Sequence, residues 1–517
     1  MLIAAVDIGT SSTRALLFDD ASFTGASAAV EYGLKSTAPG TAELDPMEVL
    51  DALVQCVRDL SHGADAAFDG VVLSAAMHSL IAVDDGGTPL TLAHTWADNR
   101  ATRQAAALRA TPGAQALYAD TGVPIHPMSP LVKLLWMREE APALFARAAK
   151  FVSIKEFVCH RLFDRWVVDD AIASASGLYS LARRDWSALA LATAGIDRAR
   201  LSPVARPREI LRGLAPAYAT AMHIDAATPF VLGGSDGCLA NLGAGLLAGE
   251  GRRRAVLTIG TSGALRMAVA EPSPDAAMRT FCYALGTDEF VIGGATNGGG
   301  MPLRWLRDNF PQLRLDVHSK YATDRAPARD PYAVLADLAQ RSPTGAGGLL
   351  FHPYLAGERA PLWNSDARAS FIGLDFSHGP HHLVRAVMEG VLLNLAMILE
   401  VLEELAGGPV EEIIAGGGFA RSAFWLQMAA DLFGRPLVVA ENPETTAQGA
   451  ALLGLHALGG VRSLSAAVAL LPRPHQRVIP NPETHGVYAR LKPIFNDVPA
   501  TLAPLYASLA ALRRDLA

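Results

Sequence analysis

Short apolar runs rich in Val, Ile and Leu alternate with helical patterns through most of the chain. This alternation predicts an α/β fold in which helices cover a buried, largely parallel or mixed sheet. The beginning of the chain differs, because residues 2–6 and 14–18 are two apolar runs separated by the small residues 9–12. Strands joined by such a short connection form a hairpin, so we expect the chain to open on an antiparallel pair.

The first clear helix signal is at residues 45–48, which read Asp-Pro-Met-Glu. Asp can cap a helix, Pro fits its first turn, and Glu follows three residues after the cap. Further along, residues 380–406 keep a helical apolar period, and the apolar run 413–415 leads into three glycines, which predicts a long helix followed by a strand. The stripe that the first helix is expected to bury is Leu50, Leu53, Val54 and Val57.

One short segment occurs twice in the chain. The tetrapeptide at residues 8–11, Ile-Gly-Thr-Ser, recurs at residues 259–262, each time between two strand-like runs. Because the copies lie near the start of each half, we expect each half to carry its own copy of one small-residue hairpin. A chain of 517 residues also exceeds one ordinary hydrophobic core. We therefore predict two domains, over residues 1–248 and 249–517.

Composition and charge exclude several classes of protein. A formal net charge of -7 gives no basic surface for a nucleic acid. Every long apolar run is interrupted before a membrane-spanning length, and residues 1–6 lack the basic start of a secretory signal, so we expect a cytoplasmic protein that does not bind membranes. The cysteines are scattered and form no C-x-x-C pair, which predicts reduced thiols and neither a disulfide framework nor a zinc site.

The two Gly-Thr-Ser turns are candidate phosphate sites. Small residues let backbone N–H groups approach phosphate oxygens closely, so such turns can hold a phosphate without the lysine of a P-loop. Neither a G-x-x-x-x-G-K-[ST] run nor the protein-kinase motif set occurs in the sequence. Asp7 ends the first strand directly before the first turn, where a carboxylate can hold Mg²⁺ through water beside the phosphates. An Asp that only caps the turn is the alternative.

Residues 230–237, Phe-Val-Leu-Gly-Gly-Ser-Asp-Gly, permit two incompatible interpretations. As G-x-S-x-G they match the nucleophile elbow of a serine hydrolase, with Ser235 as the nucleophile and a histidine later in the chain. In a kinase Asp236 is the chemical group instead, a carboxylate at a strand end that accepts the proton of the attacking hydroxyl. The paired hairpins favour the kinase, because a hydrolase has no use for them. The histidines available to a hydrolase are His352, His378, His381, His382 and His456.

Taken together, these motifs resemble the FGGY carbohydrate kinases over most of the chain. The resemblance implies an α/β fold of two actin-like, ribonuclease H-like domains with an interdomain cleft, and it implies ATP and Mg²⁺ as ligands. Each segment is short, but their order and spacing are specific. The segments that carry the resemblance are 7–14 (Asp-Ile-Gly-Thr-Ser-Ser-Thr-Arg), 128–136 (Met-Ser-Pro-Leu-Val-Lys-Leu-Leu-Trp), 234–237 (Gly-Ser-Asp-Gly), 259–262 (Ile-Gly-Thr-Ser) and 416–421 (Gly-Gly-Gly-Phe-Ala-Arg).

The same resemblance implies roles for individual residues. Asp236 matches the family's catalytic base. Met77 and His78 match its sugar-contacting pair, and Trp96, Asp98 and Arg100 lie in a second stretch expected to bind the substrate. Some members have Asn or a similar residue where this chain has Arg421, which puts that contact in doubt. The residues expected to bind ATP are Gly9, Thr10, Ser11, Arg14, Gly260, Thr261, Gly300, Gly417, Gly418 and Arg421.

Residues 76–84 and 95–100 look most like the gluconate kinases of the family, whereas xylulose kinases usually have Gly after the His. A substrate carboxylate should meet a cation, because a charge-assisted contact offsets desolvation better than hydroxyls do. Arg100 and Lys133 are the candidates, and a structural cation is the alternative for each.

The sequence thus predicts a kinase that converts D-gluconate to 6-phosphogluconate, with Asp236 as general base. Three alternatives stay open: a xylulose or other ketose or polyol kinase, a serine hydrolase using Ser235, and a non-catalytic actin-like nucleotide switch. A homodimer is the one protein assembly that we consider.

Overall fold

The computed structural model describes residues 1–64, 66–249, 251–286, 289–310, 330–440, 442, 444–472 and 476–516. The chain divides into two compact units, each assembled from stretches that are distant in the sequence. The first unit consists of Met1–Glu250, Ala268–Ile292 and Glu444–Pro472, and the second of Gly251–Met267, Gly293–Pro443 and Arg473–Ala517.

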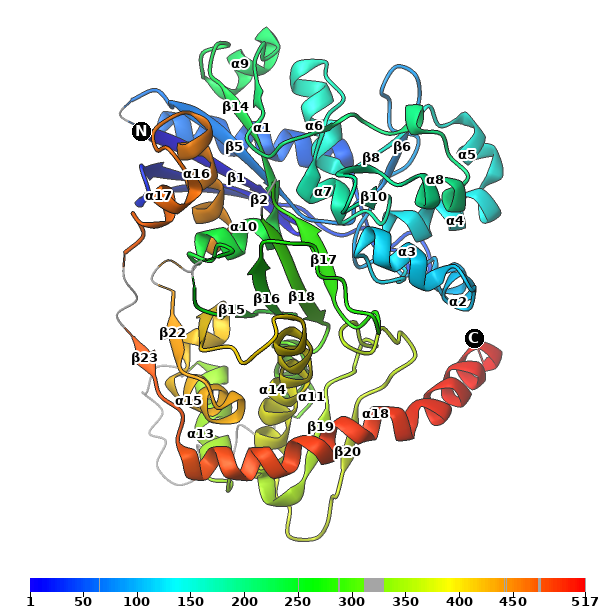
Figure 1. The fold of residues 1–517 in the computed structure, drawn as a ribbon, viewed down its shortest axis with the longest axis vertical. Coiled ribbons are helices and arrows are strands. Elements are labelled where there is room, and N and C mark those ends of the chain that lie inside the picture. Colours follow the sequence, from blue (N-terminus) through cyan, green and yellow to red (C-terminus); the bar gives the residue numbers. More distant parts are fainter. Residues whose placement is uncertain are drawn as a thin grey trace, which may run out of the picture. The chain divides into compact units, whose positions relative to one another are not determined.

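The first unit is built on a six-stranded sheet with the order β13-β14-β5-β1-β2-β3. Strands β1 and β2 form the predicted antiparallel hairpin, which closes at the pair Ile8 and Thr13. Strands β5 and β14 continue the sheet in parallel with β1, and β1, β2 and β5 can be followed side by side in Figure 1. The bounds of the sheet strands are β1 Leu2–Ile8, β2 Ser12–Asp19, β3 Ser22–Glu31, β5 Gly70–Ala75, β13 Ile210–Leu211 and β14 Phe230–Ser235.

Helix α1 (Pro46–His62) begins where the sequence predicts, and the Asp45 side chain accepts a hydrogen bond from the Met47 N–H. The apolar stripe of α1 is buried as expected except for Val54, which is only half-buried. Helix α1 packs on β2 and β3, whereas α16 (Thr445–Ala457), which is distant in sequence, packs on β1, β5 and β14. The sequence pattern did not place α16 in this unit.

The rest of the first unit consists of short elements that carry its loops. Its short strands are β4 Glu43–Leu44, β6 Ile81–Val83, β7 Ala93–His94, β8 Lys150–Val152, β9 Val168–Asp169, β10 Tyr179–Ser180, β11 Asp185–Trp186, β12 Val204–Ala205 and β17 Phe281–Ala284. Its other helices are α2 Thr102–Arg109, α3 Ala114–Thr121, α4 Pro130–Glu140, α5 Pro142–Arg147, α6 Ile154–Phe163, α7 Asp170–Ser174, α8 Ala188–Ala194, η1 Arg198–Arg200, α9 Pro216–Met222, α10 Asp236–Gly243 and α17 Leu464–Val468.

The second sheet has the order β17-β18-β16-β15-β21-β22-β23. Strands β15 and β16 form the second predicted hairpin and close at the pair Ile259 and Gly263. Strand β21 runs parallel to β15, and β22 runs parallel to β21, as β5 and β14 do in the first unit. The bounds are β15 Arg254–Ile259, β16 Gly263–Val269, β18 Phe290–Thr296, β21 Glu412–Gly416, β22 Leu437–Val439 and β23 Arg477–Val478.

The predicted long helix is α14 (Pro380–Leu405), which is buried along most of its length. Helix α18 (Pro482–Leu516), the red helix at the C-terminal end in Figure 1, packs against α14 and α15. No element was predicted for this part of the chain. The other elements of the second unit are α11 Met301–Asn309, α13 Pro331–Gln340, η2 Ala346–Gly348, η3 Gly418–Arg421, α15 Ala423–Phe433, β19 Leu350–His352 and β20 Ser370–Ile372.

Two general expectations concern the thiols and the membrane. All four cysteines are free thiols, in agreement with the predicted reduced state, and all four are buried: Cys56, Cys159, Cys238 and Cys282. Among the described residues, no helix combines the length and the apolar character needed to cross a bilayer.

Candidate active site

Three parallel strands of the first unit end at one edge of the sheet, and the candidate residues follow them. Asp7 of β1 is in register with Ser74 of β5, and Ser74 is in register with Gly234 of β14. The carboxyl ends of parallel strands form the usual ligand edge of an α/β sheet. Asp7, the Met77 and His78 pair after β5, and Asp236 after β14 therefore come together at this edge.

Asp236 is the first residue of α10, directly after β14. Strand β14 shifts register between Val231 and Gly234, and Gly233 has a φ of 71°. A side chain at Gly233 would place its Cβ 1.6 Å from the Leu73 carbonyl oxygen, so only glycine fits there. The bulge thus sets how the strand end that carries Asp236 leaves the sheet. The Asp236 carboxylate is half-buried and accepts a hydrogen bond of 2.7 Å from the Gly237 N–H.

The structure contradicts the interpretation of Ser235 as a nucleophile. Its side chain is completely buried, and its Oγ makes no hydrogen bond within the described structure, to a histidine or to any other group. Its backbone is in an ordinary extended conformation (φ -81°, ψ 150°), unlike the strained turn that exposes a nucleophile elbow. The G-x-S-x-G match is therefore incidental.

The tip of the first hairpin is tied to a residue predicted to bind the sugar. The Trp96 indole N–H donates a hydrogen bond of 2.9 Å to the Thr10 hydroxyl. The Gly9 N–H donates to the Ser12 carbonyl across the turn, at 3.0 Å, and Ser11 is exposed. A predicted phosphate residue and a predicted substrate residue are thus in direct contact.

Asp7 lies beside this hairpin, buried but not isolated. It accepts a hydrogen bond of 3.0 Å from the Ser74 hydroxyl and lies 3.5 Å from the Arg14 guanidinium, which also pairs with Glu444 at 2.7 Å. Burial raises the pKa of the Asp7 carboxyl, while the positive charge of Arg14 and the hydrogen bond from Ser74 partly oppose this rise.

No group of three or more His, Cys, Asp or Glu side chains in the described part of the chain is arranged to hold a metal ion by itself. Mg²⁺ beside a nucleotide needs fewer protein ligands, because phosphate oxygens and water hold it together with only one or two carboxylates. A single carboxylate at the hairpin, Asp7, fits that mode of binding.

His78 has an unusual backbone and is fixed from three directions. Its φ of 67° lies in the left-handed region, which is uncommon for a residue other than glycine and often marks a functional site. Its Nδ1 lies 2.7 Å from the Ala175 carbonyl oxygen, so Nδ1 carries the proton and donates. Its Nε2 lies 3.4 Å from the Tyr283 hydroxyl, and its own carbonyl accepts from the Lys133 ammonium at 2.9 Å. The ring orientation is therefore defined before any substrate binds.

Asp98 and Arg100, two predicted substrate residues, bind each other. The Arg100 guanidinium contacts both oxygens of Asp98, at 2.8 and 2.7 Å, and also pairs with Glu43. The Asp98 carboxylate is fully buried, and although burial opposes its ionisation, the hydrogen bonds from Arg100 and from the Ala42 N–H outweigh it and lower the pKa of Asp98. These contacts favour a structural role for both residues.

Lys133, the other candidate for a substrate carboxylate, is completely buried in α4. Its ammonium donates to three backbone carbonyls, those of His78 at 2.9 Å, Thr95 at 2.6 Å and Met128 at 2.8 Å. Burial lowers the pKa of Lys133 to about 7. All three ammonium protons are engaged, so Lys133 holds together the segments that carry His78 and Trp96 and has none left for a substrate.

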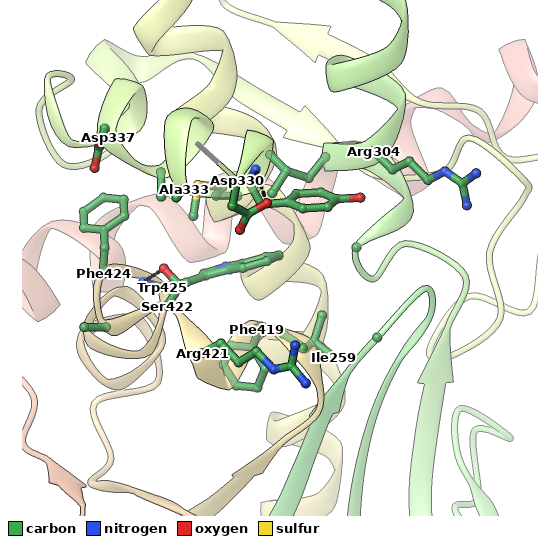
Figure 2. Close-up of a pocket in the computed structure, with 18 of the residues that line it drawn as sticks. Ile259, Arg304, Asp330, Ala333, Asp337, Phe419, Arg421, Ser422, Phe424 and Trp425 are labelled. Carbon is green, nitrogen blue, oxygen red and sulfur yellow. Dashed lines mark hydrogen bonds between the residues drawn. The ribbon is translucent and has the colours of Figure 1, made fainter. Parts of the chain in front are cut away.

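The second unit contains a cavity of about 740 Å³ at the tip of its hairpin. Figure 2 shows the Trp425 indole lying across this cavity, with Asp330 on one side of it and Phe419 and Arg421 on the other. An aromatic plane with a few polar groups around it is typical of a site for a planar organic ligand. The predicted ATP residues that line the cavity are Gly260, Thr261, Gly300, Gly418 and Arg421.

Two glycine segments shape this cavity. Gly417 is not among its lining residues, but it has a φ of 86° and lies so close to the Ile259 carbonyl oxygen that a Cβ would come within 2.6 Å of it. The Gly300 N–H donates to the Gly260 carbonyl at 2.7 Å. A Cβ on Gly299 would lie 2.3 Å from the backbone of Ser262. The glycine run 298–300 therefore packs directly on the hairpin tip.

Sequence reasoning missed most of the other residues that line the cavity. They come from α11, α13 and α15, and their spacing in the sequence gives no sign that they meet. The one available signal was the aromatic pair Phe424 and Trp425, close after the three glycines. The missed polar and aromatic lining residues are Arg304, Asp330, Tyr332, Asp337, Gln340, Phe419, Ser422, Phe424 and Trp425.

Comparison with known proteins identifies the family. Residues 2–243 match the N-terminal domain of the FGGY family of carbohydrate kinases, and residues 255–458 match its C-terminal domain. A gluconokinase from Bacillus licheniformis is 41% identical over 512 residues, which cover 99% of this chain and 98% of that protein.

Two solved structures from Lactobacillus acidophilus have the same fold. A ligand-bound xylulose kinase superposes with a TM-score of 0.90 at 32% identity, and a gluconate kinase with a TM-score of 0.89 at 31% identity. Each comparison covers 98% of this chain and 99% of the other. They confirm the predicted α/β fold with two actin-like domains. The chain therefore belongs to the FGGY family of carbohydrate kinases.

Proposed function

We propose that this kinase transfers the γ-phosphate of ATP to a hydroxyl of D-gluconate and so forms 6-phosphogluconate. The observation that carries the proposal is the strand edge of the first unit, where Asp7 lies near the end of β1 and where His78 and Asp236 follow β5 and β14. The cavity of the second unit, an aromatic pocket at a glycine-rich hairpin, suits a nucleotide. Transfer requires that the nucleotide and the sugar acid are bound at the same time.

Asp236 is proposed as the general base. Its carboxylate would accept the proton of the substrate hydroxyl while that oxygen attacks the γ-phosphorus, and the bond to the leaving ADP would break in line. The helix that begins at Asp236 directly follows β14, a strand paired on both sides within the sheet, which is the rigid support that such a base needs.

The phosphate chain is assigned to backbone donors and to Arg14. The turns at residues 9–11 and 260–262 each present small residues that let N–H groups approach phosphate oxygens. Mg²⁺, when bound, would neutralise charge on the phosphates, and Asp7 is the residue proposed to hold it. The Trp425 and Tyr332 rings are proposed to contact the adenine.

The sugar acid is assigned to Met77, His78 and Trp96. Since Nδ1 of His78 donates to Ala175, its Nε2 is the acceptor atom of the neutral ring, and a substrate hydroxyl would bind there beside the Tyr283 hydroxyl. Arg100 and Lys133 are engaged inside the protein, so the carboxylate of gluconate would rely on neutral donors. The sequence identity of 41% to a gluconokinase supports gluconate as the substrate.

D-Xylulose is the second candidate, because a xylulose kinase structure is as similar to this chain as the gluconate kinase structure is. The test is ADP release from Mg-ATP with the purified protein across a panel of aldonates, ketoses and polyols. Strong stimulation by D-gluconate is expected. Stimulation by a ketose alone would keep the mechanism and refute the substrate, and a slow ATP turnover that no sugar accelerates would favour a nucleotide switch.

A further inference from the structure

A buried ion pair lies beneath the proposed active site and has no assigned role. The Lys155 ammonium, from α6, lies 2.7 Å from the Asp169 carboxylate at the end of β9, and only 2% and 0% of the two side chains are exposed. A buried ion pair adds little net stability compared with apolar residues of the same volume, because desolvation of both charges cancels most of their attraction. Its presence here therefore calls for a reason other than stability.

The lysine reaches the strand that carries Asp236. The Lys155 ammonium also donates a hydrogen bond of 3.0 Å to the Gly234 carbonyl. Gly234 is the first residue to regain the sheet register after the bulge of β14, and it stands two positions before Asp236. Bulged strands bend and twist at the extra residues, so the direction of the strand end after a bulge has to be held by other contacts. Lys155 makes one of these contacts.

Asp169 contacts α7, the helix that precedes the carbonyl bound by His78. The other Asp169 carboxylate oxygen accepts a hydrogen bond of 3.0 Å from the Ile172 N–H and so caps α7. The residue after α7, Ala175, offers the carbonyl that accepts the proton of His78 Nδ1. The cap and the carbonyl lie on either side of one short, fully buried helical turn. Asp169 thereby fixes the acceptor that orients the His78 ring.

We propose that the Lys155–Asp169 pair is a positioning element that sets Asp236, through Gly234, and His78, through α7, in a fixed relation to each other. The inference rests on the proposed function, since it assumes that Asp236 is the base and that His78 contacts the sugar. The new element is that the Lys155–Asp169 ion pair maintains the positions of Asp236 and His78 relative to each other. A displacement of about 1 Å between reacting groups costs about 10²-fold in rate, which is the effect expected when the link is cut.

The test uses three variants of the full chain that remove different parts of the link. Lys155→Met removes the bond to Gly234 and leaves Asp169 as an unpaired buried charge, so both Tm and kcat should fall. Lys155→Met with Asp169→Asn removes both charges and keeps an oxygen to cap α7, so Tm should recover while kcat stays down by about 10²-fold. Asp169→Asn alone keeps an oxygen to cap α7, but it breaks the ion pair and leaves Lys155 as an unpaired buried charge, so both Tm and kcat should fall.

The measurements separate positioning from stability. kcat is normalised to the folded fraction, and KM for ATP should change little, because Lys155 and Asp169 contact neither the hairpin at residues 9–14 nor the cavity of the second unit in the contacts described above. Arg385→Met breaks the other buried pair considered, Arg385–Glu389 with 8% and 3% exposure, and should lower Tm without changing the normalised kcat. Hydrogen exchange of the backbone amides at residues 234–240 should become faster in Lys155→Met and in the double variant.

Recovery of kcat together with Tm in the double variant would overturn the proposal. So would a normalised kcat of Asp169→Asn equal to that of the wild type, and this outcome can be measured even where Lys155→Met does not fold. All assays use the sugar that stimulates the wild-type protein most. Failure of the proposed function is seen separately, because the wild-type protein would then release no more ADP with any sugar than without one.

Discussion

The β1–β2 hairpin and the β15–β16 hairpin follow the same backbone path but differ in their side chains. In both, a strand ending in Ile-Gly-Thr-Ser turns back on itself and has a parallel strand on its other side. Alignment of the repeated segments places Asp7 of the first hairpin opposite Thr258 of the second, and Arg14 opposite Leu265. At these two aligned positions, only the first copy has an ionisable side chain. The second copy has instead the glycine run 298–300 packed on its tip and an aromatic cavity beside it.

The comparison indicates that the turn supplies backbone donors for a phosphate, whereas the residues around the turn decide what else each hairpin can do. A Gly-Thr-Ser turn can present N–H groups wherever the backbone follows this path, since the donors belong to the main chain. Acid-base and metal chemistry require carboxylates, which only the first copy has at its base. Recognition of a planar ring such as adenine requires an aromatic surface, and in the described part of the chain such a surface lies in the cavity beside the second copy.

The largest effect is expected at the chemical centre of the first unit. Asp236→Asn should lower kcat by about 10² to 10⁴-fold, the usual contribution of a general base. The affinity for the nucleotide should stay the same, because the nucleotide cavity is built from other residues. Coupled ADP release gives kcat, and calorimetric titration with a non-hydrolysable ATP analogue gives the affinity.

Ser235→Ala is the matched control for this variant, one residue away. Because the Ser235 hydroxyl is buried without a hydrogen bond in the described structure, its loss should change kcat by less than about twofold. If Ser235→Ala were the inactive variant and Asp236→Asn the active one, the assignment of the base would be wrong.

The second effect is expected at the tip of the other hairpin. Gly299→Ala would place a Cβ 2.3 Å from the Ser262 backbone, so the tip has to move by about 1 Å, and kcat/KM for ATP should fall by about 10²-fold. KM for the sugar should change little. Gly486→Ala adds the same methyl group to α18, where nothing lies within 4 Å, and should leave both constants as they are. Equal effects on the ATP and sugar constants in Gly299→Ala would contradict the division of roles between the two hairpins.

The smallest effect is expected for Asp7→Asn, which should change how the stability of the protein depends on pH. Because burial raises the pKa of Asp7 in the folded protein above that of an unfolded Asp, about 3.9, folding takes up a proton between the two values. The contribution of Asp7 to stability is therefore lost as pH rises through this window and stays lost above the folded pKa. Asp7→Asn lacks this loss, so its Tm relative to the wild type should increase over the same window.

Thermal unfolding without Mg²⁺ or nucleotide, from pH 3 to neutral, measures this difference. Parallel curves for the two proteins would refute the raised pKa. The concentration of Mg²⁺ needed for half-maximal activity should also rise in Asp7→Asn, because the proposed carboxylate ligand is lost.

The hairpins, the first helix and the long helix could be predicted because their signals are local. Residues 45–48 contain a cap, a proline and a glutamate within one turn, and 8–11 and 259–262 contain their turn residues directly between the strands. The glycines and the aspartate of the strand ends were found for the same reason. The match of these segments to one family then assigned the candidate residues to the two halves of the chain.

The order of residues along the chain was enough to predict the main helices and strands and the polar residues at the strand ends, since both depend on residues that are neighbours in the sequence. The tertiary structure decided which side chains are already engaged. Arg100 pairs with Glu43, which is 57 residues away, Lys133 binds carbonyls up to 55 residues away, and Ser235 is buried. The aromatic cavity and the Lys155–Asp169 link also join residues from several elements. Burial and the pairing of charges depend on distances in space, and no periodicity in one segment encodes them.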